Sequence, residues 1–172
     1  MAAYTSSSRP HTQVIRLLLE VLYAFPVEGA DSYIVSVSYK GLVRGILEAA
    51  HVPATHLESV YSALLHTRKL GRAEGRKKLV LALDGLHCSA ALTNLMNKLW
   101  ESQDKDCLVQ IKVLQDALAG STYGSEAVRQ LRQVLEFASA MLPNQTDRIR
   151  IVVDPALSLP RYQVICRNID VP

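Results

Sequence analysis

The sequence has little of what several protein classes require. Its three cysteines, Cys88, Cys107 and Cys166, are widely spaced and include no Cys-x-x-Cys pair, so we expect neither a disulfide framework nor a thiolate zinc site. No apolar run approaches the ~18 to 20 residues that a membrane-spanning helix needs, and the N-terminal "MAAYTSSSRP" lacks the apolar stretch of a secretory signal. These absences predict an intracellular protein of a reducing compartment, the cytoplasm or nucleus, with no membrane partner.

Signatures of catalysis are also missing. None of the five histidines has a second histidine four residues away on an expected helix beside an acid, which is the spacing of zinc hydrolases. Gly71 and Gly75 are not followed by the Lys-Ser or Lys-Thr pair of a nucleotide-binding loop. His87 and Cys88 are adjacent, so on a helix they point in different directions, and we interpret them as a turn histidine and a buried thiol. We therefore predict no catalytic residue, no metal, no cofactor and no enzymatic activity.

What the chain does have is a folded composition and one basic segment. Apolar residues make up 49% and charged residues 20% of the 172 residues, which is typical of a globular protein. The stretch "HTRKLGRAEGRKKLVLALDG" at 66–85 places six Lys or Arg beside one Glu before an apolar run. Two interpretations are open: a basic loop that binds a polyanion, or a solvated turn before a buried strand.

The spacing of apolar residues divides residues 12–85 into short elements. Intervals of three and four residues indicate helices, alternation indicates a strand, and Thr55 three residues before Glu58 is a capping-box pattern that begins a helix. The expected elements are a helix over 14–25 that ends at Pro26, a strand over 33–39, a helix over 42–51, a helix over 55–67 and a strand over 79–83. The basic segment then forms the turn between the last two.

Beyond Gly85, helices predominate. Three amphipathic stripes lie between residues 89 and 142, and two β-like runs follow at 149–153 and 161–166. We therefore predict an α+β, mostly helical fold. Its expected parts are a flexible arm over 1–11, a winged-helix-like module over 12–85, a helical region for oligomerisation or partner binding over 86–143, and a β-ribbon tail forming a C-terminal β-hairpin over 144–172.

Residues 41–85 contain three local features in a particular order. Val52 lies in the turn between two expected helices, Glu74-Gly75-Arg76 lies in the basic segment, and "LVLALDG" forms the strand after it. In these features the stretch resembles the DNA-binding part of MarR-type regulators, whose turn carries an apolar residue and whose wing carries Asp-x-Arg before a strand. His51 departs from the glycine often found in that turn. The resemblance implies a winged helix-turn-helix that inserts one helix in the DNA groove, and a homodimer built by helices outside it.

The resemblance also assigns candidate nucleic-acid-binding residues. The second helix of the module would present polar side chains to base edges, two cations would anchor its end, and the wing would contact phosphates. In that order, these residues are His56, Ser59, Ser62 and His66; Arg68 and Lys69; and Arg72, Arg76, Lys77 and Lys78.

Two functions are consistent with these patterns. The first is a non-enzymatic protein that binds nucleic acid, double-stranded DNA through a winged helix and its basic wing, in transcription regulation. The second is a structural or assembly subunit, capsid-like or part of a protein complex, whose amphipathic helices make protein–protein contacts and whose basic segment meets an acidic protein surface. Both predict a homo-oligomer. Exposure of the polar residues between His56 and His66 beside the basic turn would distinguish the first from the second.

Overall fold

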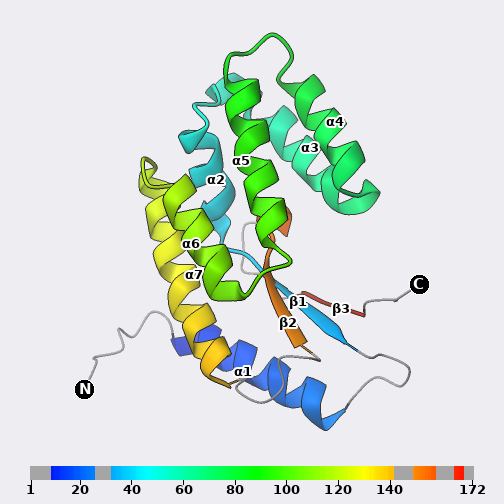
Figure 1. Cartoon of the computed structure of the whole chain (residues 1–172), viewed down its shortest axis with the longest axis vertical. Coiled ribbons are helices and arrows are strands. Elements are labelled where there is room, and N and C mark those ends of the chain that lie inside the picture. Colours follow the sequence, from blue (N-terminus) through cyan, green and yellow to red (C-terminus); the bar gives the residue numbers. More distant parts are fainter. Residues whose placement is uncertain (1–8, 26–31, 142–148, 158–164, 169–172) are drawn as a thin grey trace.

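Helices dominate the computed structural model, which describes residues 9–25, 32–141, 149–157 and 165–168 (Figure 1). In chain order the elements are α1 (Arg9–Ala24), β1 (Tyr33–Val37), α2 (Lys40–Ala49), the 3-10 turn η1 (Ala54–His56), α3 (Leu57–Leu70), α4 (Arg72–Ala82), α5 (Cys88–Ser102), α6 (Cys107–Ala117), α7 (Thr122–Met141), β2 (Ile149–Val153), the 3-10 turn η2 (Pro155–Leu157) and β3 (Ile165–Asn168). The predicted α+β, mostly helical class is confirmed. Residues 1–8 of the expected arm lie outside the described residues, and α1 already begins at Arg9.

Three strands form one small mixed sheet in the order β2-β1-β3. Strand β1 lies in the middle, parallel to β2 and antiparallel to β3, with Val35 opposite Ile151 on one side and Cys166 on the other. The alternation of Tyr33, Val35 and Val37 correctly predicted the strand, because these three side chains are buried. The predicted C-terminal hairpin is wrong, since β2 and β3 pair with β1 and not with each other.

All helices from α2 to α7 lie in the chain between β1 and β2, which are neighbours in the sheet. Figure 1 shows α1 near the sheet at one end of the molecule and the α3–α4 pair toward the other end. Parallel neighbours need a crossover connection, and here the crossover is the whole helical body. Of the strand expected over 161–166, residues 161–164 lie outside the described residues.

The predicted wing is a helix. The residues expected to form a basic turn and a strand belong to the end of α3, a break at Gly71 with φ of 89°, and α4. Leu79 and Leu83 are buried four residues apart, whereas Val80 and Leu81 are 44% and 73% exposed, which is the pattern of a helical face and not of a strand. Arg, Ala, Glu and Lys in this segment also favour a helix. The winged helix, with its strand over 79–83, is therefore wrong.

The turn after α2 uses a left-handed residue that is not glycine. His51 has φ of 56°, and its N–H donates to the carbonyl of Glu48 at 3.0 Å, while the N–H of Val52 donates to the carbonyl of Leu47 at 2.9 Å. These two bonds form a Schellman motif, which satisfies the last carbonyls of the helix. The predicted end of this helix near His51 is confirmed.

Helix α3 begins close to the predicted residue but without the capping box. The turn η1 follows Pro53, whose preceding residue is kept out of the helical region. Thr55 Oγ1 lies 2.9 Å from Nδ1 of His56, and no side chain caps the first turn of α3. The proline thus marked the helix start correctly, whereas the hydrogen bonding proposed for Thr55 is wrong.

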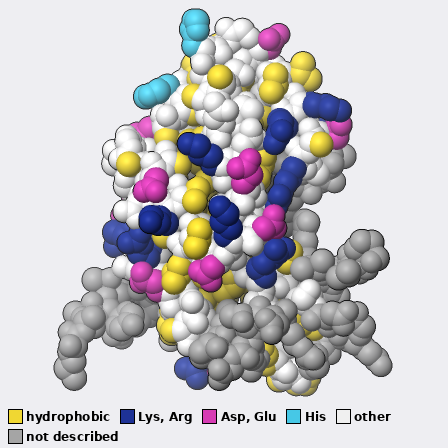
Figure 2. Space-filling model, in the orientation of Figure 1, with side chains coloured by type: hydrophobic (Ala, Val, Ile, Leu, Met, Phe, Trp, Pro, Cys, Tyr) yellow, Lys and Arg dark blue, Asp and Glu magenta, His cyan; other side chains and the backbone are white. Residues whose placement is uncertain are grey.

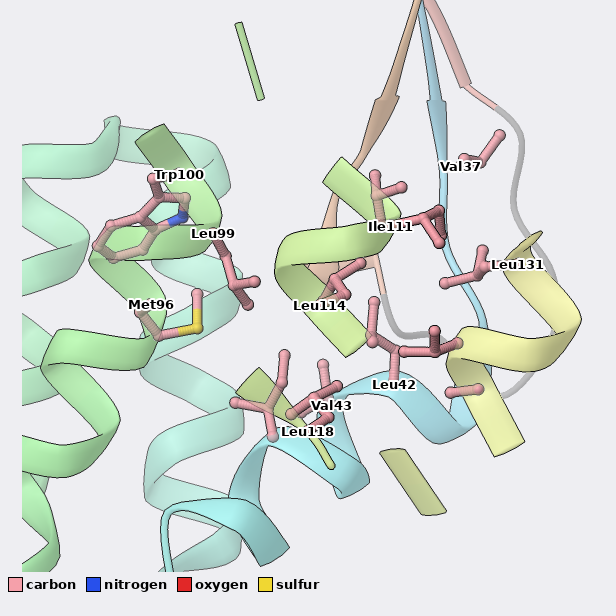
Figure 3. Packing of buried hydrophobic residues seen from close by; sticks show 14 of the residues in the cluster. Val37, Leu42, Val43, Met96, Leu99, Trp100, Ile111, Leu114, Leu118 and Leu131 are labelled. Carbon is pink, nitrogen blue, oxygen red and sulfur yellow. The ribbon is translucent and has the colours of Figure 1, made fainter. Parts of the chain in front are cut away.

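One cluster of buried apolar side chains joins the sheet to the helices. In Figure 3, Leu42 from α2 and Leu131 from α7 lie near Ile111 and Leu114 from α6, beside Val37 of β1. Burying each aliphatic side chain of this size contributes roughly 1.5–3 kcal/mol. The core therefore holds the inserted helices and the sheet together as one packed body.

Helices α2 and α7 cross where two glycines meet. A Cβ atom added to Gly45 would lie 2.3 Å from Cα and 2.5 Å from the backbone N of Gly124. Such distances are too short for any side chain at position 45, so the two backbones are in direct contact. This contact brings the neighbouring α2 residues Arg44 and Glu48 against the first turn of α7.

Glu48 caps α7 from a different helix. Its Oε2 accepts hydrogen bonds from the Ser121 hydroxyl and from the N–H of Tyr123, the latter at 3.3 Å, while Ser121 Oγ accepts from the N–H of Gly124 at 2.8 Å. Hydrogen bonding from Ser121, reinforced by the backbone of Tyr123, lowers the pKa of Glu48. A carboxylate at a helix N-terminus is also stabilised by the helix dipole.

We predict that Gly45→Ala lowers the free energy of unfolding by about 1–3 kcal/mol or more, because the added methyl group forces α2 away from α7. Chemical denaturation would measure the loss. Gly120→Ala is the control, since a Cβ at Gly120 has no other atom within 4 Å. Equal stability of the two variants would contradict the close crossing.

We predict that the stabilising effect of Glu48 over Gln at this position depends on pH. Because its pKa is lowered on folding, the carboxylate contributes stability above its ordinary pKa near 4.5, and this contribution is lost as the pH falls through the folded-state value. Unfolding of wild type and Glu48→Gln should therefore differ at pH 7 and converge toward pH 3. Glu136→Gln, on the exposed side of α7, is the control. A difference that is constant with pH would contradict the cap.

Candidate functional site

Helices α3 and α4 form a hairpin toward one end of the molecule (Figure 1). Gly71 joins them with φ of 89°, and a Cβ atom added there would have no atom within 4 Å, so the turn depends on a backbone conformation that glycine adopts freely and not on lack of space. The hairpin is fixed on its inner side by buried Val60, Leu64, Leu79 and Leu83. Several of the residues predicted to bind nucleic acid lie on the remaining surface of the hairpin.

A groove runs between the two helices of the hairpin. It has a volume of about 570 Å³. The residues that line it are Glu58, Ser59, Ser62, Ala63 and His66 of α3 and Lys78, Leu81 and Ala82 of α4. Ser59 and Ser62 are exposed and His66 is half-buried, with Nδ1 of His66 2.7 Å from the carbonyl of Ser62. The structure thus brings four of the predicted site residues together, Ser59, Ser62, His66 and Lys78. They lie on a hairpin of two helices, whereas the sequence predicted a helix followed by a wing.

The remaining predicted residues are placed differently. His56 lies in η1 and does not line the groove. Lys77 Nζ lies 2.7 Å from Oε1 of Glu74 in an exposed pair, and the guanidinium of Arg76 lies over Trp100 at 6.0 Å from the ring centroid. The side chains of Arg68 and Lys69 lie outside the described residues.

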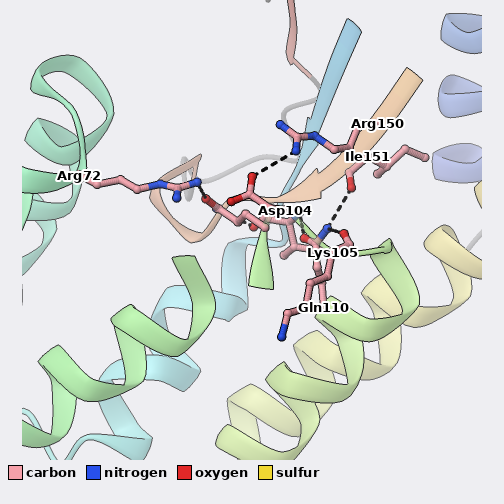
Figure 4. A network of polar contacts seen from close by, with 8 residues as sticks. Arg72, Asp104, Lys105, Gln110, Arg150 and Ile151 are labelled. Atoms are coloured by element: carbon pink, nitrogen blue, oxygen red, sulfur yellow. Dashed lines mark hydrogen bonds and ion pairs between the residues drawn. The ribbon is translucent and has the colours of Figure 1, made fainter. Parts of the chain in front are cut away.

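Arg72 belongs to a structural network. One guanidinium nitrogen donates to Oε1 of Gln103 at 2.8 Å, and Nε2 of Gln103 donates to the carbonyl of Val153 in β2 at 3.1 Å. Figure 4 shows this chain of contacts between α4 and the sheet, with an exposed pair of Arg150 and Asp104 at 3.1 Å beside it. In the structure, Arg72 therefore links the α3–α4 hairpin to the sheet through Gln103.

Gln110 completes the network on the outer edge of β2. Its Oε1 accepts from the N–H of Val153 at 2.8 Å, and its Nε2 donates to the carbonyls of Ile151 at 3.1 Å and Lys105 at 2.8 Å. Among the described residues, strand β2 has a strand neighbour on one side only, so its other edge would otherwise leave buried backbone groups unpaired. The side chains of Gln103 and Gln110 take the place of a fourth strand there.

Positive charge on the hairpin is local. Helix α4 carries four cations and one acid. On the face drawn in Figure 2, Lys and Arg side chains are interspersed with Asp and Glu and do not form a continuous basic surface. Arg76, Lys77 and Lys78 are consecutive on α4 and point in different directions, so this local charge is comparable with a few phosphate contacts and not with an extended nucleic-acid channel.

The described residues offer little for nucleophilic or metal chemistry. Burial, with the nearby charge of Asp106, raises the pKa of Cys107 to about 11, and Cys88 is also a buried free thiol. Within the described part of the chain, no group of three His, Cys, Asp or Glu side chains could hold a metal ion. No helix among these residues is both long and apolar enough to cross a membrane.

Sequence reasoning missed the glutamines and the α2–α7 residues. Gln103 and Gln110 are buried, yet a glutamine near a helix end gives no sign that it binds a strand edge. Arg44 and Glu48 are four residues apart around Gly45, and that spacing predicts one helical face. The partner face on α7 lies more than seventy positions away in the chain, so spacing alone could not reveal it.

Solved structures supply the comparison that decides the fold. No protein-family model matches the chain, and no curated protein matches it. A histidyl-tRNA synthetase from Nostoc sp. PCC 7120 aligns with a TM-score of 0.60 and 15% identity, over 86% of this chain and 32% of that one. A histidine–tRNA ligase subunit from Alicyclobacillus acidocaldarius aligns with a TM-score of 0.60 and 18% identity, over 98% of this chain and 51% of that one.

The fold resembles part of histidyl-tRNA synthetases. At 15% and 18% identity the likeness concerns the fold alone, and the chain spans about a third and a half of the length of these two proteins. This likeness, together with the helical α4, overturns the resemblance to MarR-type regulators. The prediction of a DNA-binding protein of transcription regulation is therefore wrong.

We predict that Gln110→Leu lowers the free energy of unfolding by about 2–4 kcal/mol, because it leaves the N–H of Val153 and the carbonyl of Ile151 without partners in a buried place. Chemical denaturation would measure the loss. Gln115→Leu, which removes an exposed contact with Arg132, should cost less than about 0.5 kcal/mol. An equally small effect at position 110 would show that the glutamine does not hold the strand edge.

Proposed function

We propose that this chain is a non-catalytic RNA-binding protein built on part of a histidyl-tRNA synthetase-like fold, and that its ligand is tRNA. The observation that carries the proposal is the excess of positive charge on α4, four cations to one acid, with Lys78 in the polar groove of the α3–α4 hairpin. The class of ligand comes from the two structural neighbours, which are named as a histidyl-tRNA synthetase and a histidine–tRNA ligase subunit.

The chemistry of the α4 cations suits a phosphate backbone. The pair between Lys77 and Glu74 is exposed, and such pairs contribute at most about 1 kcal/mol, so a phosphate can replace the carboxylate. Lys78 lines the groove beside Ser62 and His66, whose polar atoms can bond sugar hydroxyls or phosphate oxygens. The cations attract the polyanion, and the neutral polar groups position it.

A non-catalytic role is supported by the chemistry of the described residues. The thiols of Cys88 and Cys107 are buried and the pKa of Cys107 is raised, which disfavours a thiolate nucleophile at either position. The hairpin groove pairs serines and a histidine with a lysine, but Nδ1 of His66 is engaged by the backbone of its own helix. We therefore assign these side chains to binding.

We expect the triple variant Arg76→Ala, Lys77→Ala, Lys78→Ala to bind tRNA about tenfold or more weakly at low salt, with a slope of log affinity against log salt that is smaller by about 2. Fluorescence anisotropy over a salt series would measure both. The matched control removes three exposed cations from other helices or loops, Lys98, Lys105 and Lys112.

The same measurement with a DNA duplex of equal phosphate number tests the class of ligand. Tighter binding of tRNA at each salt concentration is expected, because tRNA presents 2′-hydroxyls and unpaired bases that a DNA duplex lacks. Equal losses in the two triple variants, or equal affinity for tRNA and duplex DNA, would overturn the proposed function.

A further inference from the structure

A second hollow lies where α2, η1, α3 and the start of α7 meet, apart from the hairpin groove. Its volume is about 450 Å³, within the range of small-molecule sites. Apolar side chains of Leu47, Val52 and Leu57 contribute to its lining, together with four polar or aromatic residues, Arg44, Glu48, Tyr61 and Tyr123. An apolar lining with a few convergent polar groups is the composition of a site that binds a small organic molecule.

Arg44 is held as a flat platform. Its guanidinium carbon lies 3.6 Å from the centroid of the Tyr123 ring, which places the planar group over the face of the tyrosine. The side chain of Arg44 is exposed, so the face of the guanidinium that is turned away from Tyr123 can receive another ring. A nucleobase stacks on such a guanidinium plane as it does on an aromatic side chain.

Glu48 supplies a fixed acceptor beside this platform. Its Oε2 is engaged by Ser121 and Tyr123, which orients the carboxylate, and a carboxylate has a second oxygen that accepts hydrogen bonds. The lowered pKa of Glu48 keeps it ionised at neutral pH. A negative acceptor selects a ring edge that carries N–H donors and disfavours one that carries carbonyl oxygens.

We propose that this hollow binds one unpaired nucleobase of an RNA, stacked on Arg44 and bonded to Glu48, with a preference for guanine. The proposal rests on the proposed function, since it names a contact for the same class of ligand. Guanine offers two adjacent donors, N1–H and the N2 amino group, to Oε1 of Glu48, since Oε2 already accepts from Ser121 and Tyr123. Adenine and cytosine offer an amino group alone, and uracil offers one N–H between two carbonyl oxygens.

Mononucleotides test the site without the rest of the RNA. Titration of the whole chain with GMP, AMP, CMP and UMP, followed by amide chemical shifts, is expected to show saturable changes at Arg44, Glu48, Tyr61 and Tyr123. We expect GMP to bind about tenfold more tightly than UMP, the discrimination that one well-placed pair of hydrogen bonds gives. No saturable binding, changes confined to other residues, or equal affinities for GMP and UMP would overturn the proposal.

Three variants separate the roles of the side chains. Arg44→Gln should weaken the binding of all four nucleotides by a similar factor, because the stacking surface of the guanidinium is lost. Glu48→Gln should remove the advantage of GMP over UMP. Its affinity for UMP should stay within about twofold of the wild-type value, a change well below the discrimination expected of one hydrogen-bonded pair. Tyr61→Leu, which does not touch the α7 cap, should also weaken all four nucleotides. Arg129→Gln, a similar change on the exposed side of α7, is the control and should change none of these affinities.

The nucleotide titrations and the tRNA-binding test of the α4 variants can fail independently of each other. If tRNA binds through Arg76, Lys77 and Lys78 while no mononucleotide binds at Arg44, the base site is wrong and the proposed function stands. If GMP binds selectively while tRNA binding does not depend on α4, the hollow is a base site and the proposed role of the α3–α4 hairpin is wrong.

Discussion

The contact between Gly45 and Gly124 determines how the helices of this protein are arranged. Because neither residue has a side chain, α2 and α7 approach until their backbones touch. Glu48, one turn along α2, then reaches the first turn of α7 and caps it through Ser121. Arg44 reaches the ring of Tyr123 by the same approach. The cap, the stacked pair and the hollow between them all depend on the absence of two Cβ atoms.

A second set of contacts attaches the helices to the sheet. Gln110 and Gln103 satisfy the free edge of β2, and Arg72 extends this network to α4. One side of the α3–α4 hairpin therefore packs against the rest of the protein, where Arg72 contacts Gln103 and Arg76 lies over Trp100. The opposite side holds the groove with Ser59, Ser62 and Lys78. This division would allow α4 to support the structure on one side and to make the proposed RNA contacts on the other.

The sequence indicated the class of fold because local patterns are strong in this chain. Tyr33, Val35 and Val37 alternate as a half-buried strand should, and Pro53 marks the start of a helix. The run after Lys78 was misassigned because Leu79, Val80, Leu81 and Leu83 include both faces of a helix, and a short apolar run has the same appearance in a buried strand. The exposure of Leu81 between buried Leu79 and Leu83 resolves the ambiguity, because a strand would place all three side chains on one face.

Ser59, Ser62 and His66 were predicted to lie on a recognition helix and Lys78 on a wing, and in the structure these four residues line one groove of the α3–α4 hairpin. The arrangement of that surface could not be predicted, because it depends on α4 being a helix packed on α3. The hollow beside Arg44 was invisible to local patterns, since its two halves come from helices at opposite ends of the inserted region.

The position of the helices between two neighbouring strands has a consequence for how the chain folds. Tyr33 of β1 pairs with Ile149 of β2, more than a hundred positions later in the chain. Closing so long a loop through an unfolded chain carries a large entropy cost, and contacts of this kind slow folding. Helices α2 to α7 pack through contacts that are closer in sequence, and once they are packed they shorten the distance between the strand ends. We therefore expect strand pairing to be a late step, and a substitution at the Gly45–Gly124 contact to delay the formation of a sheet that it does not touch.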